Sequence, residues 1–144
     1  MLGEKLGESS GKFSGTRVLS AGPEPKLEVS FQGRGTLLGV GITDLGTYWQ
    51  VFRPGGVLYG EGQVVMVTDD GEMAPWIGGG VGRPTGPGYA ASYGVTGSFQ
   101  TASPKLARLN GVTTVIEYEV EADSSYRWTA WEWTGAAGPP PRQP

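Results

Sequence analysis

Residues 76–88 read WIGGGVGRPTGPG, and no other stretch of the chain constrains the fold as tightly. Gly78, Gly80 and Gly82 recur at every second position, which in an extended chain places all three on one face of a strand. A strand that lacks side chains on one face lets another backbone or a ligand approach closely. The stretch therefore predicts a β-strand that ends in a turn over residues 83–88.

The composition fits one ordered domain. The chain has 144 residues, a length at which roughly two-thirds of the unfolded surface is buried on folding. Its 26 Gly and 11 Pro would suggest low complexity, but 5 Trp, 6 Tyr and 4 Phe lie in alternating segments, so we interpret the glycines as breaks and bends between strands. We expect a single domain over residues 1–134 and a disordered Gly/Pro-rich tail over residues 135–144.

Charge and missing residue types exclude several classes of function. The chain has no Cys and no His, which removes disulfides, thiolate or imidazole metal sites and His-dependent catalysis. A net charge of -3 argues against nucleic-acid and anionic-membrane partners. The charged first eight residues are unlike a secretory signal, and no apolar stretch approaches the roughly 18 residues that span a bilayer. The expected location is the cytoplasm.

Alternation of apolar and polar residues predicts an all-β fold. The clearest case is residues 26–32, where Leu27, Val29 and Phe31 share one face, as in a half-buried antiparallel strand. Further strands are predicted over residues 13–19, 36–43, 47–53, 57–68, 72–83, 89–101, 112–122 and 126–134. Turns are predicted at residues 21–25, 33–35, 44–46, 54–56, 69–71 and 123–125.

The predicted strands are sequential and have no crossover helices between them. An antiparallel sheet of eight or nine strands curls and either closes or splits in two, and glycines inside strands favour closure because barrel corners need sharp bends. We therefore predict a mostly up-and-down β-barrel. One short helical turn is predicted over residues 103–111, where Ser103 suits an N-cap, Pro104 the first helical position and Asn110-Gly111 the end.

Residues 79–88, GGVGRPTGPG, resemble the glycine-rich strand and turn, G-G-x-G-x-F-x-x-A-x-G, of allene oxide cyclase-like and dirigent-like barrels. They depart from that pattern at Pro84, where an aromatic is usual, and are one residue shorter before Gly88. The whole chain also resembles small uncharacterised bacterial proteins, with the pattern at residues 58–62 and 101–111. The resemblance implies a barrel with a central cavity, which is often oligomeric in this group of proteins. It also implies that no metal or cofactor is needed. Members of the group steer cyclisations of small molecules. The resemblance transfers no catalytic residue.

Glu61 is the first candidate for catalysis. It shares a strand face with Tyr59 and Gln63, so an inward orientation would bring a carboxyl, a phenol and an amide together in an apolar cavity. Burial would raise the pKa of this carboxyl and suit it to general acid–base work beside Tyr59. The alternative is an outward, solvated Glu61, the commoner situation, since Glu is rarely buried without a partner.

Glu117, Glu119 and Glu121 stand on one face of one strand. Three carboxylates at this spacing could hold a hard cation, but a solvated barrel exterior explains them better. Tyr118 then faces inward and becomes a candidate pocket phenol. Arg83 could join the amides of the neighbouring glycines around a carboxylate; its alternative is a surface residue at a turn.

Aromatic residues supply most of the candidate ligand contacts. In the last strand Trp128 lies on one face and Trp131 and Trp133 on the other, so part of this cluster meets either a partner subunit or the barrel mouth. Ordinary packing in a core or interface is the alternative to a ligand lining. The predicted ligand-binding residues are Tyr48, Gln63, Trp76, Arg83, Tyr93, Tyr118 and Trp128.

Two functions remain open at this point. The first is a barrel that binds an apolar or amphipathic small molecule and acts as a cofactor-independent cyclase or isomerase through orientation and desolvation. The second is a non-enzymatic module with a filled interior that works through aromatic-rich outer surfaces in an oligomer. A homo-oligomer is expected. A hollow of ligand size would favour the first function, and a filled interior the second.

Overall fold

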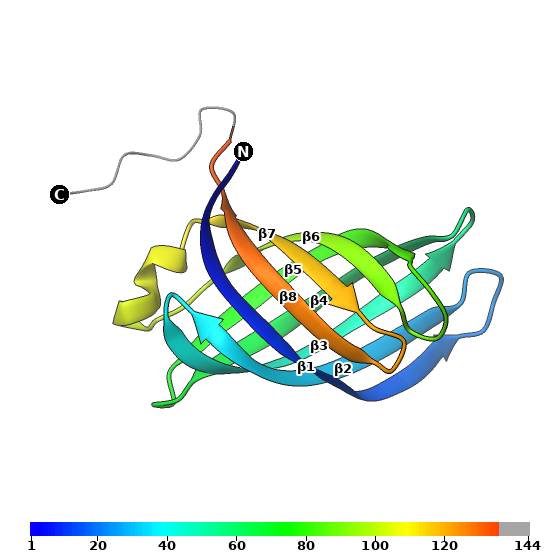
Figure 1. Cartoon of the computed structure of the whole chain (residues 1–144), viewed down its shortest axis with the longest axis horizontal. Coiled ribbons are helices and arrows are strands. Elements are labelled where there is room, and N and C mark those ends of the chain that lie inside the picture. The colour runs from blue at the N-terminus through cyan, green and yellow to red at the C-terminus, as the bar shows by residue number, and fades with distance from the viewer. Residues whose placement is uncertain (136–144) are drawn as a thin grey trace.

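A computed structural model of the chain describes residues 1–135, which form a closed barrel of antiparallel strands (Figure 1). Each strand pairs with the next along the chain, and the last pairs with the first. The strands are β1 (Leu2–Ser20), β2 (Lys26–Leu37), β3 (Val40–Arg53), β4 (Val57–Thr68), β5 (Met73–Pro84), β6 (Ala91–Phe99), β7 (Thr113–Val120) and β8 (Ser125–Trp133). The predicted antiparallel up-and-down barrel is confirmed. The predicted tail lies, apart from Gly135, outside the described residues.

The glycine stretch forms the inner face of β5. Ala74 and Trp76 are buried, and because side chains alternate along a strand, Gly78, Gly80 and Gly82 continue the same inner face. β4 lies beside it and also presents glycines inward, opposite those of β5. Two adjacent strands therefore leave part of the barrel wall without side chains, as the spacing of the glycines predicts.

Aromatic rings use much of the room that these glycines leave. A Cβ at Gly78 on β5 or at Gly97 on β6 would overlap the indole ring of Trp76. In the same way, a Cβ at Gly46 on β3 would overlap the ring of Phe31. Large rings can lie flat inside a narrow barrel only where the facing wall is bare.

A short 3-10 helix, η1 (Pro104–Leu109), closes one end of the barrel (Figure 1). Leu106 and Leu109 are completely buried and belong to the central apolar cluster. Pro104 opens the helix, and Gly111 follows it with a positive φ of 79°. The helical turn predicted over residues 103–111 is confirmed, and its leucines plug this end of the interior.

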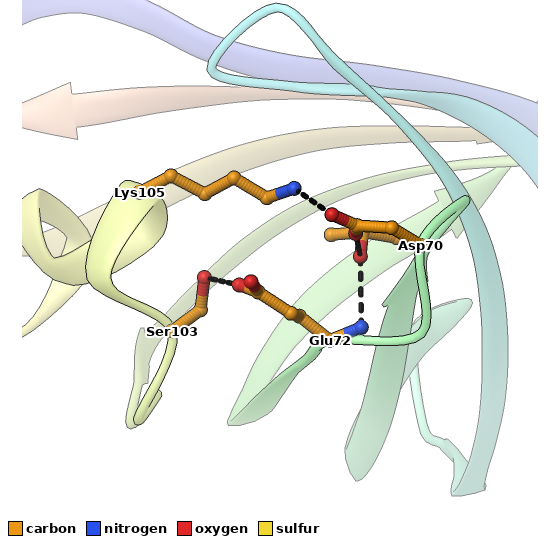
Figure 2. Close-up of polar contacts among 5 residues, drawn as sticks. Asp70, Glu72, Ser103 and Lys105 are labelled. Carbon is orange, nitrogen blue, oxygen red and sulfur yellow. Dashed lines mark hydrogen bonds and ion pairs between the residues drawn. The ribbon is translucent and has the colours of Figure 1, made fainter.

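Polar contacts fasten η1 to the β4–β5 turn (Figure 2). The hydroxyl of Ser103 sits at the N-cap position of η1 but donates to the carboxylate of Glu72. The Lys105 ammonium lies 2.6 Å from a carboxylate oxygen of Asp70. The plug is therefore held by apolar burial on its inner side and by surface pairs on its outer side.

The opposite end carries the four remaining connections between strands (Figure 1). Tyr89 from the β5–β6 connection packs its ring edge-on against Phe13 of β1, with 5.4 Å between the ring centroids. β1 has only β2 and β8 as neighbours in the barrel, so this contact reaches across the end. The mouth of the barrel is thus partly covered by one loop.

Two predicted turns are wrong, because residues 33–35 continue β2 and residues 44–46 continue β3. The chain turns instead at Leu38-Gly39, where both residues have positive φ, 49° and 78°, as a two-residue hairpin of the I′ type requires. Leu38 is a poor residue for this conformation, which is why turn propensity alone pointed elsewhere.

The first strand is also longer than predicted, since β1 begins at Leu2 and not at residue 13. Its early residues include the exposed side chains of Lys5, Glu8 and Lys12. In a barrel such charges are tolerated on the outward positions of a strand, while buried Leu6 and Ser9 face the core. The alternation of inward and outward residues is irregular around Lys5, where the register with β8 shifts. For this reason the sequence did not show this part of the strand.

Candidate functional site

A cavity of about 80 Å³ lies inside the barrel. One side is the bare wall of β4 and β5, formed by Gly60, Gly62, Gly78 and Gly80. The rest of the lining is mostly aromatic and aliphatic and comes from Val64, Met66 and Trp76 farther along these two strands and from β2, β3, β6, β7 and β8. The glycines therefore serve two purposes, because they admit the rings described above and leave a hollow beside them.

Tyrosines from three strands meet at this cavity. The hydroxyl groups of Tyr48 on β3 and Tyr118 on β7 lie 3.0 Å apart. Tyr93 on β6 donates a hydrogen bond of 2.7 Å to the side-chain oxygen of Gln50 on β3. Tyr93 also packs on Tyr118, with 5.2 Å between ring centroids. Both hydrogen bonds cross the interior between strands that are not neighbours.

Burial keeps these phenols neutral. Desolvation raises the pKa of Tyr93 to about 12, and it raises the pKa values of Tyr48 and Tyr118 well above their ordinary range. A neutral phenol can donate a hydrogen bond to a carbonyl or to an oxygen that gains negative charge in a reaction. It cannot serve as a base near pH 7. The cavity is therefore suited to uncharged ligands that carry an oxygen acceptor.

A buried carboxylate lies next to this cluster. Asp44 on β3 is fully buried and accepts hydrogen bonds from the hydroxyl of Tyr126 at 2.7 Å and from Nε1 of Trp128 at 3.2 Å. The hydroxyl of Ser9 donates to its other oxygen. Since Trp128 also lines the cavity, Asp44 fixes one of the rings that shape it.

Asp44 is the important residue that the sequence analysis missed. Asp44, Leu45 and Gly46 read as a turn because Asp and Gly favour turns. In the structure β3 runs straight through this triplet, with Ile42, Asp44, Gly46 and Gln50 buried. No matching alternation of apolar residues is present in the sequence at this point, so no local signal indicated a buried, hydrogen-bonded Asp.

Six predicted ligand-binding residues border the cavity. Five of them, Tyr48, Trp76, Tyr93, Tyr118 and Trp128, lie on inward positions of their strands. Gln63, like Glu61 on the same strand, belongs to the β4 wall of the cavity but occupies an outward position. Trp76 is held by a hydrogen bond of 2.9 Å from its Nε1 to the hydroxyl of Thr114. As predicted, Tyr118 faces inward and Trp128 lies on the opposite face of β8 from Trp131 and Trp133.

The other predicted residues point away from the interior. Leu58, Val64 and Met66 are the buried positions of β4, so Glu61 and Gln63 between them are exposed. Glu61 accepts a hydrogen bond of 3.1 Å from the hydroxyl of Tyr59 on the outer surface. The structure thus has the outward, solvated arrangement of Glu61 that the sequence left as the alternative.

Arg83 is exposed and donates to the backbone carbonyl of Gly55 at 3.3 Å. It ties the end of β5 to the β3–β4 turn at the mouth of the barrel. Arg83 therefore has the position that the sequence left as its alternative, that of a surface residue at a turn. The guanidinium of Arg83 does not line the cavity.

Glu117 and Glu119 on β7 and Glu121 just after it lie on the barrel exterior, where Glu117 and Glu121 are exposed and Glu119 is half-buried. Within residues 1–135, no group of three Asp or Glu side chains gathers closely enough to hold a metal ion. In that same part of the chain, no helix is long and apolar enough to cross a membrane.

The geometry defines a class, the small closed eight-stranded antiparallel barrels with an aromatic interior. Solved structures share this fold. A conserved protein of unknown function from Rhodopseudomonas palustris superposes with a TM-score of 0.75 at 14% identity, over 92% of this chain and 99% of that one. A protein of unknown function from Clostridium acetobutylicum gives 0.78 at 13% identity, over 91% and 98%. A beta-barrel like protein from Acinetobacter baumannii gives 0.75 at 18% identity, over 92% and 94%.

Sequence comparisons add no family. No protein-family model matches the chain, and no curated protein matches it. The structural likeness, at identities of 18% or less, establishes the barrel and not an activity. The resemblance to allene oxide cyclase-like and dirigent-like barrels stays a prediction beyond the barrel itself.

Proposed function

We propose that the barrel binds a small, uncharged, apolar or amphipathic molecule in its interior and promotes a cyclisation or isomerisation by holding that molecule in one conformation. The observation that carries the proposal is the cavity between the bare glycine wall and the neutral phenols of Tyr48, Tyr93 and Tyr118. Orientation in such a site lowers a barrier by roughly 7 to 11 kcal/mol in favourable cases, without metal, Cys or His.

The chemistry of the lining limits the ligand. The side chains that point into the cavity are uncharged, since Glu61 belongs to its wall but faces outward. The Asp44 carboxylate lies behind Trp128 and already accepts three hydrogen bonds. An ionised ligand would lose its hydration with no opposite charge to replace it. A flat, unsaturated molecule with a carbonyl or hydroxyl oxygen fits the rings and the phenol donors. At about 80 Å³ the cavity is smaller than the roughly 300 Å³ of a pocket for a drug-sized molecule. A ligand of that size therefore requires the interior to open, and the hydrogen-bonded pair of Tyr93 and Gln50 is the part that would move.

Binding is tested with the uncharged fluorescent dye N-phenylnaphthylamine. We expect its emission to rise on addition of the protein and the Trp emission of the protein to fall. Val64→Phe places a ring in the cavity, because Val64 is a buried lining residue, and should weaken dye binding at least tenfold. Val115→Phe is the control on the outward face of β7. Equal binding by the two variants would place the dye outside the barrel and contradict the proposal.

Catalysis is tested with a poly-β-ketone that cyclises spontaneously by several routes. We expect the protein to change the ratio of the cyclised products, measured by chromatography, and Val64→Phe to restore the uncatalysed ratio. Tyr93→Phe, which removes one phenol donor at the cavity, should reduce the change. A product ratio that is the same with and without protein would remove the catalytic part of the proposal and leave the binding part to the dye experiment.

A further inference from the structure

The outward charges of the barrel are dense on one side and sparse on the other. β7, β8, β1 and β2 carry the outward charges of Glu117, Glu119, Arg127, Glu8 and Lys12, among others. On β3 to β6, the outward residues of segments 43–47, 63–67, 73–81 and 94–98 include no charged side chain. These four segments lie side by side in the sheet. We call their outward surface the neutral face.

Large apolar side chains are exposed on the neutral face. Ile77 is 68% exposed, Met73 57% and Val81 52%. Register places Leu45 on β3 and Val65 on β4 opposite each other, and Val65 opposite Pro75 on β5. The apolar residues therefore form one continuous patch over three strands. Single exposed apolar residues are ordinary, but a continuous patch bordered by polar residues marks an interaction surface.

The size of the patch fits the centre of a protein interface. The segment from Met73 to Val81 extends roughly 26 Å and each of the other three roughly 13 Å, so four strands spaced about 4.8 Å apart give a projected area of about 300 Å². A stable interface buries about 800 Å² on each partner, with an apolar centre and a polar rim. Because side chains protrude, the accessible area of the patch is larger than its projected area. Tyr59, Glu61 and Arg83 border the patch and would form the polar rim of the interface.

The neutral face suits a partner without charge on the contacting surface. A basic or acidic partner would find no opposite charge within its four segments. A second copy of the same face meets this condition by symmetry, and it keeps the densely charged sides of two molecules of net charge -3 turned away from each other. Within these four segments every strand is paired on both sides, so the neutral face offers side chains and not a free strand edge to a partner.

We propose that the neutral face is the interface of a symmetric dimer in which two copies of this chain pack face to face. The sheets would lie about 10 Å apart, as in other packed sheets. Gly94, an outward residue of β6, is consistent with such close approach. A Cβ placed there meets nothing in the described part of the chain within 4 Å, so packing within one barrel does not require glycine.

The dimer is tested by sedimentation over a range of micromolar concentrations. We expect wild-type protein at twice the chain mass of 15.1 kDa. Gly94→Glu places a charge on the neutral face where the isolated barrel has open space, and it should raise the dimer dissociation constant at least tenfold. Gly15→Glu is the matched control, since the position on β1 is equally open and lies outside the neutral face. This control should remain dimeric.

A second variant, Ile77→Glu, should also give monomers, and circular dichroism should show an intact barrel for all three variants. A wild-type protein that is monomeric at every concentration overturns the proposal. A dimer that survives both Gly94→Glu and Ile77→Glu overturns it as well, because the interface must then lie elsewhere. If the wild-type protein were monomeric and bound lipid vesicles through Ile77, the neutral face would be a lipid-binding surface. That result would also overturn the dimer proposal.

Discussion

At the scale of single residues, Asp44 contributes most to the order of the interior. Its carboxylate joins Ser9 of β1 to Tyr126 and Trp128 of β8, across the seam where the first and last strands meet. Each donor is buried, so each would lose its hydrogen bond without gaining water if the carboxylate were removed. Asp44 thus stabilises the closure of the barrel and the position of a cavity ring at the same time.

Replacement of Asp44 by Asn should lower the free energy of unfolding by about 2 to 4 kcal/mol, because the amide group presents donors to neighbours that are themselves donors. Urea unfolding monitored by Trp fluorescence measures this change. The control is Asp69→Asn, where an exposed pair with Arg34 is lost; we expect a change within about 1 kcal/mol. Equal effects of the two substitutions would show that the Asp44 network does not stabilise the fold.

The sequence predicted only part of the candidate site, because some of its side chains are held by residues far away in the chain. Tyr118 was predicted to face inward because alternation fixes the face of a strand once its exposed glutamates are known. The same alternation separated Trp128 from Trp131 and Trp133 without saying which face is the inner one. Asp44 could not be placed, because its hydrogen-bond donors lie 35, 82 and 84 positions away in the chain. Glu61 has no comparable buried donor set, and the inner face of its strand is held by Leu58, Val64 and Met66.

At the scale of elements, β6 shows how glycine can be required on one face and optional on the other. Gly97 faces inward beneath the ring of Trp76, whereas Gly94 faces outward into open space. The strand predictions succeeded where alternation was regular, as in β4 and β5. They failed at the Leu38-Gly39 turn, because the local preference of Leu is overridden there by pairing of the flanking strands.

Gly97→Val should destabilise the barrel by about 1 to 3 kcal/mol, since the added methyl groups must displace Trp76 from a packed interior. Gly94→Val, three residues away on the same strand, should be neutral or slightly stabilising, because glycine inside a strand carries an entropic cost. Thermal unfolding at low concentration compares the two. A loss at Gly94 equal to that at Gly97 would contradict the assignment of faces.

The plug η1 offers a second test at this scale. Leu106→Ala removes a completely buried side chain and should cost about 2 to 5 kcal/mol. Lys105→Ala removes only the exposed pair with Asp70 shown in Figure 2, and we expect a loss of less than about 1 kcal/mol. Urea midpoints measure both. A larger loss for Lys105→Ala would mean that the surface contacts, and not the leucines, hold the end closed.

At the scale of the whole molecule, the buried phenols make stability sensitive to alkaline pH. The pKa of Tyr93 in the folded barrel, about 12, lies above its ordinary value of 10.0, and those of Tyr48, Tyr118 and Tyr126 are also raised. The unfolded chain therefore releases these protons first. Stability is fully present below pH 10 and is lost as the pH rises toward 12 and beyond.

We expect ionisation of the buried tyrosines, followed by absorbance, to coincide with loss of the barrel signal in circular dichroism. Tyr93→Phe should lose less stability between pH 10 and pH 12 than the wild type, because one of the titrating groups is gone. Ionisation of all the tyrosines near pH 10 in a folded barrel would contradict the burial of the cluster.

The meeting of the first and last strands has a kinetic consequence. Every strand pair except β1–β8 joins neighbours along the chain, whereas the ammonium of Met1 donates to the carbonyl of Gly135 across almost the full described length, at 3.0 Å. Closing so long a loop costs the most chain entropy. We expect the hairpins of neighbouring strands to form first and the pairing of β1 with β8 to form last. The three hydrogen bonds to Asp44 would form in this last step.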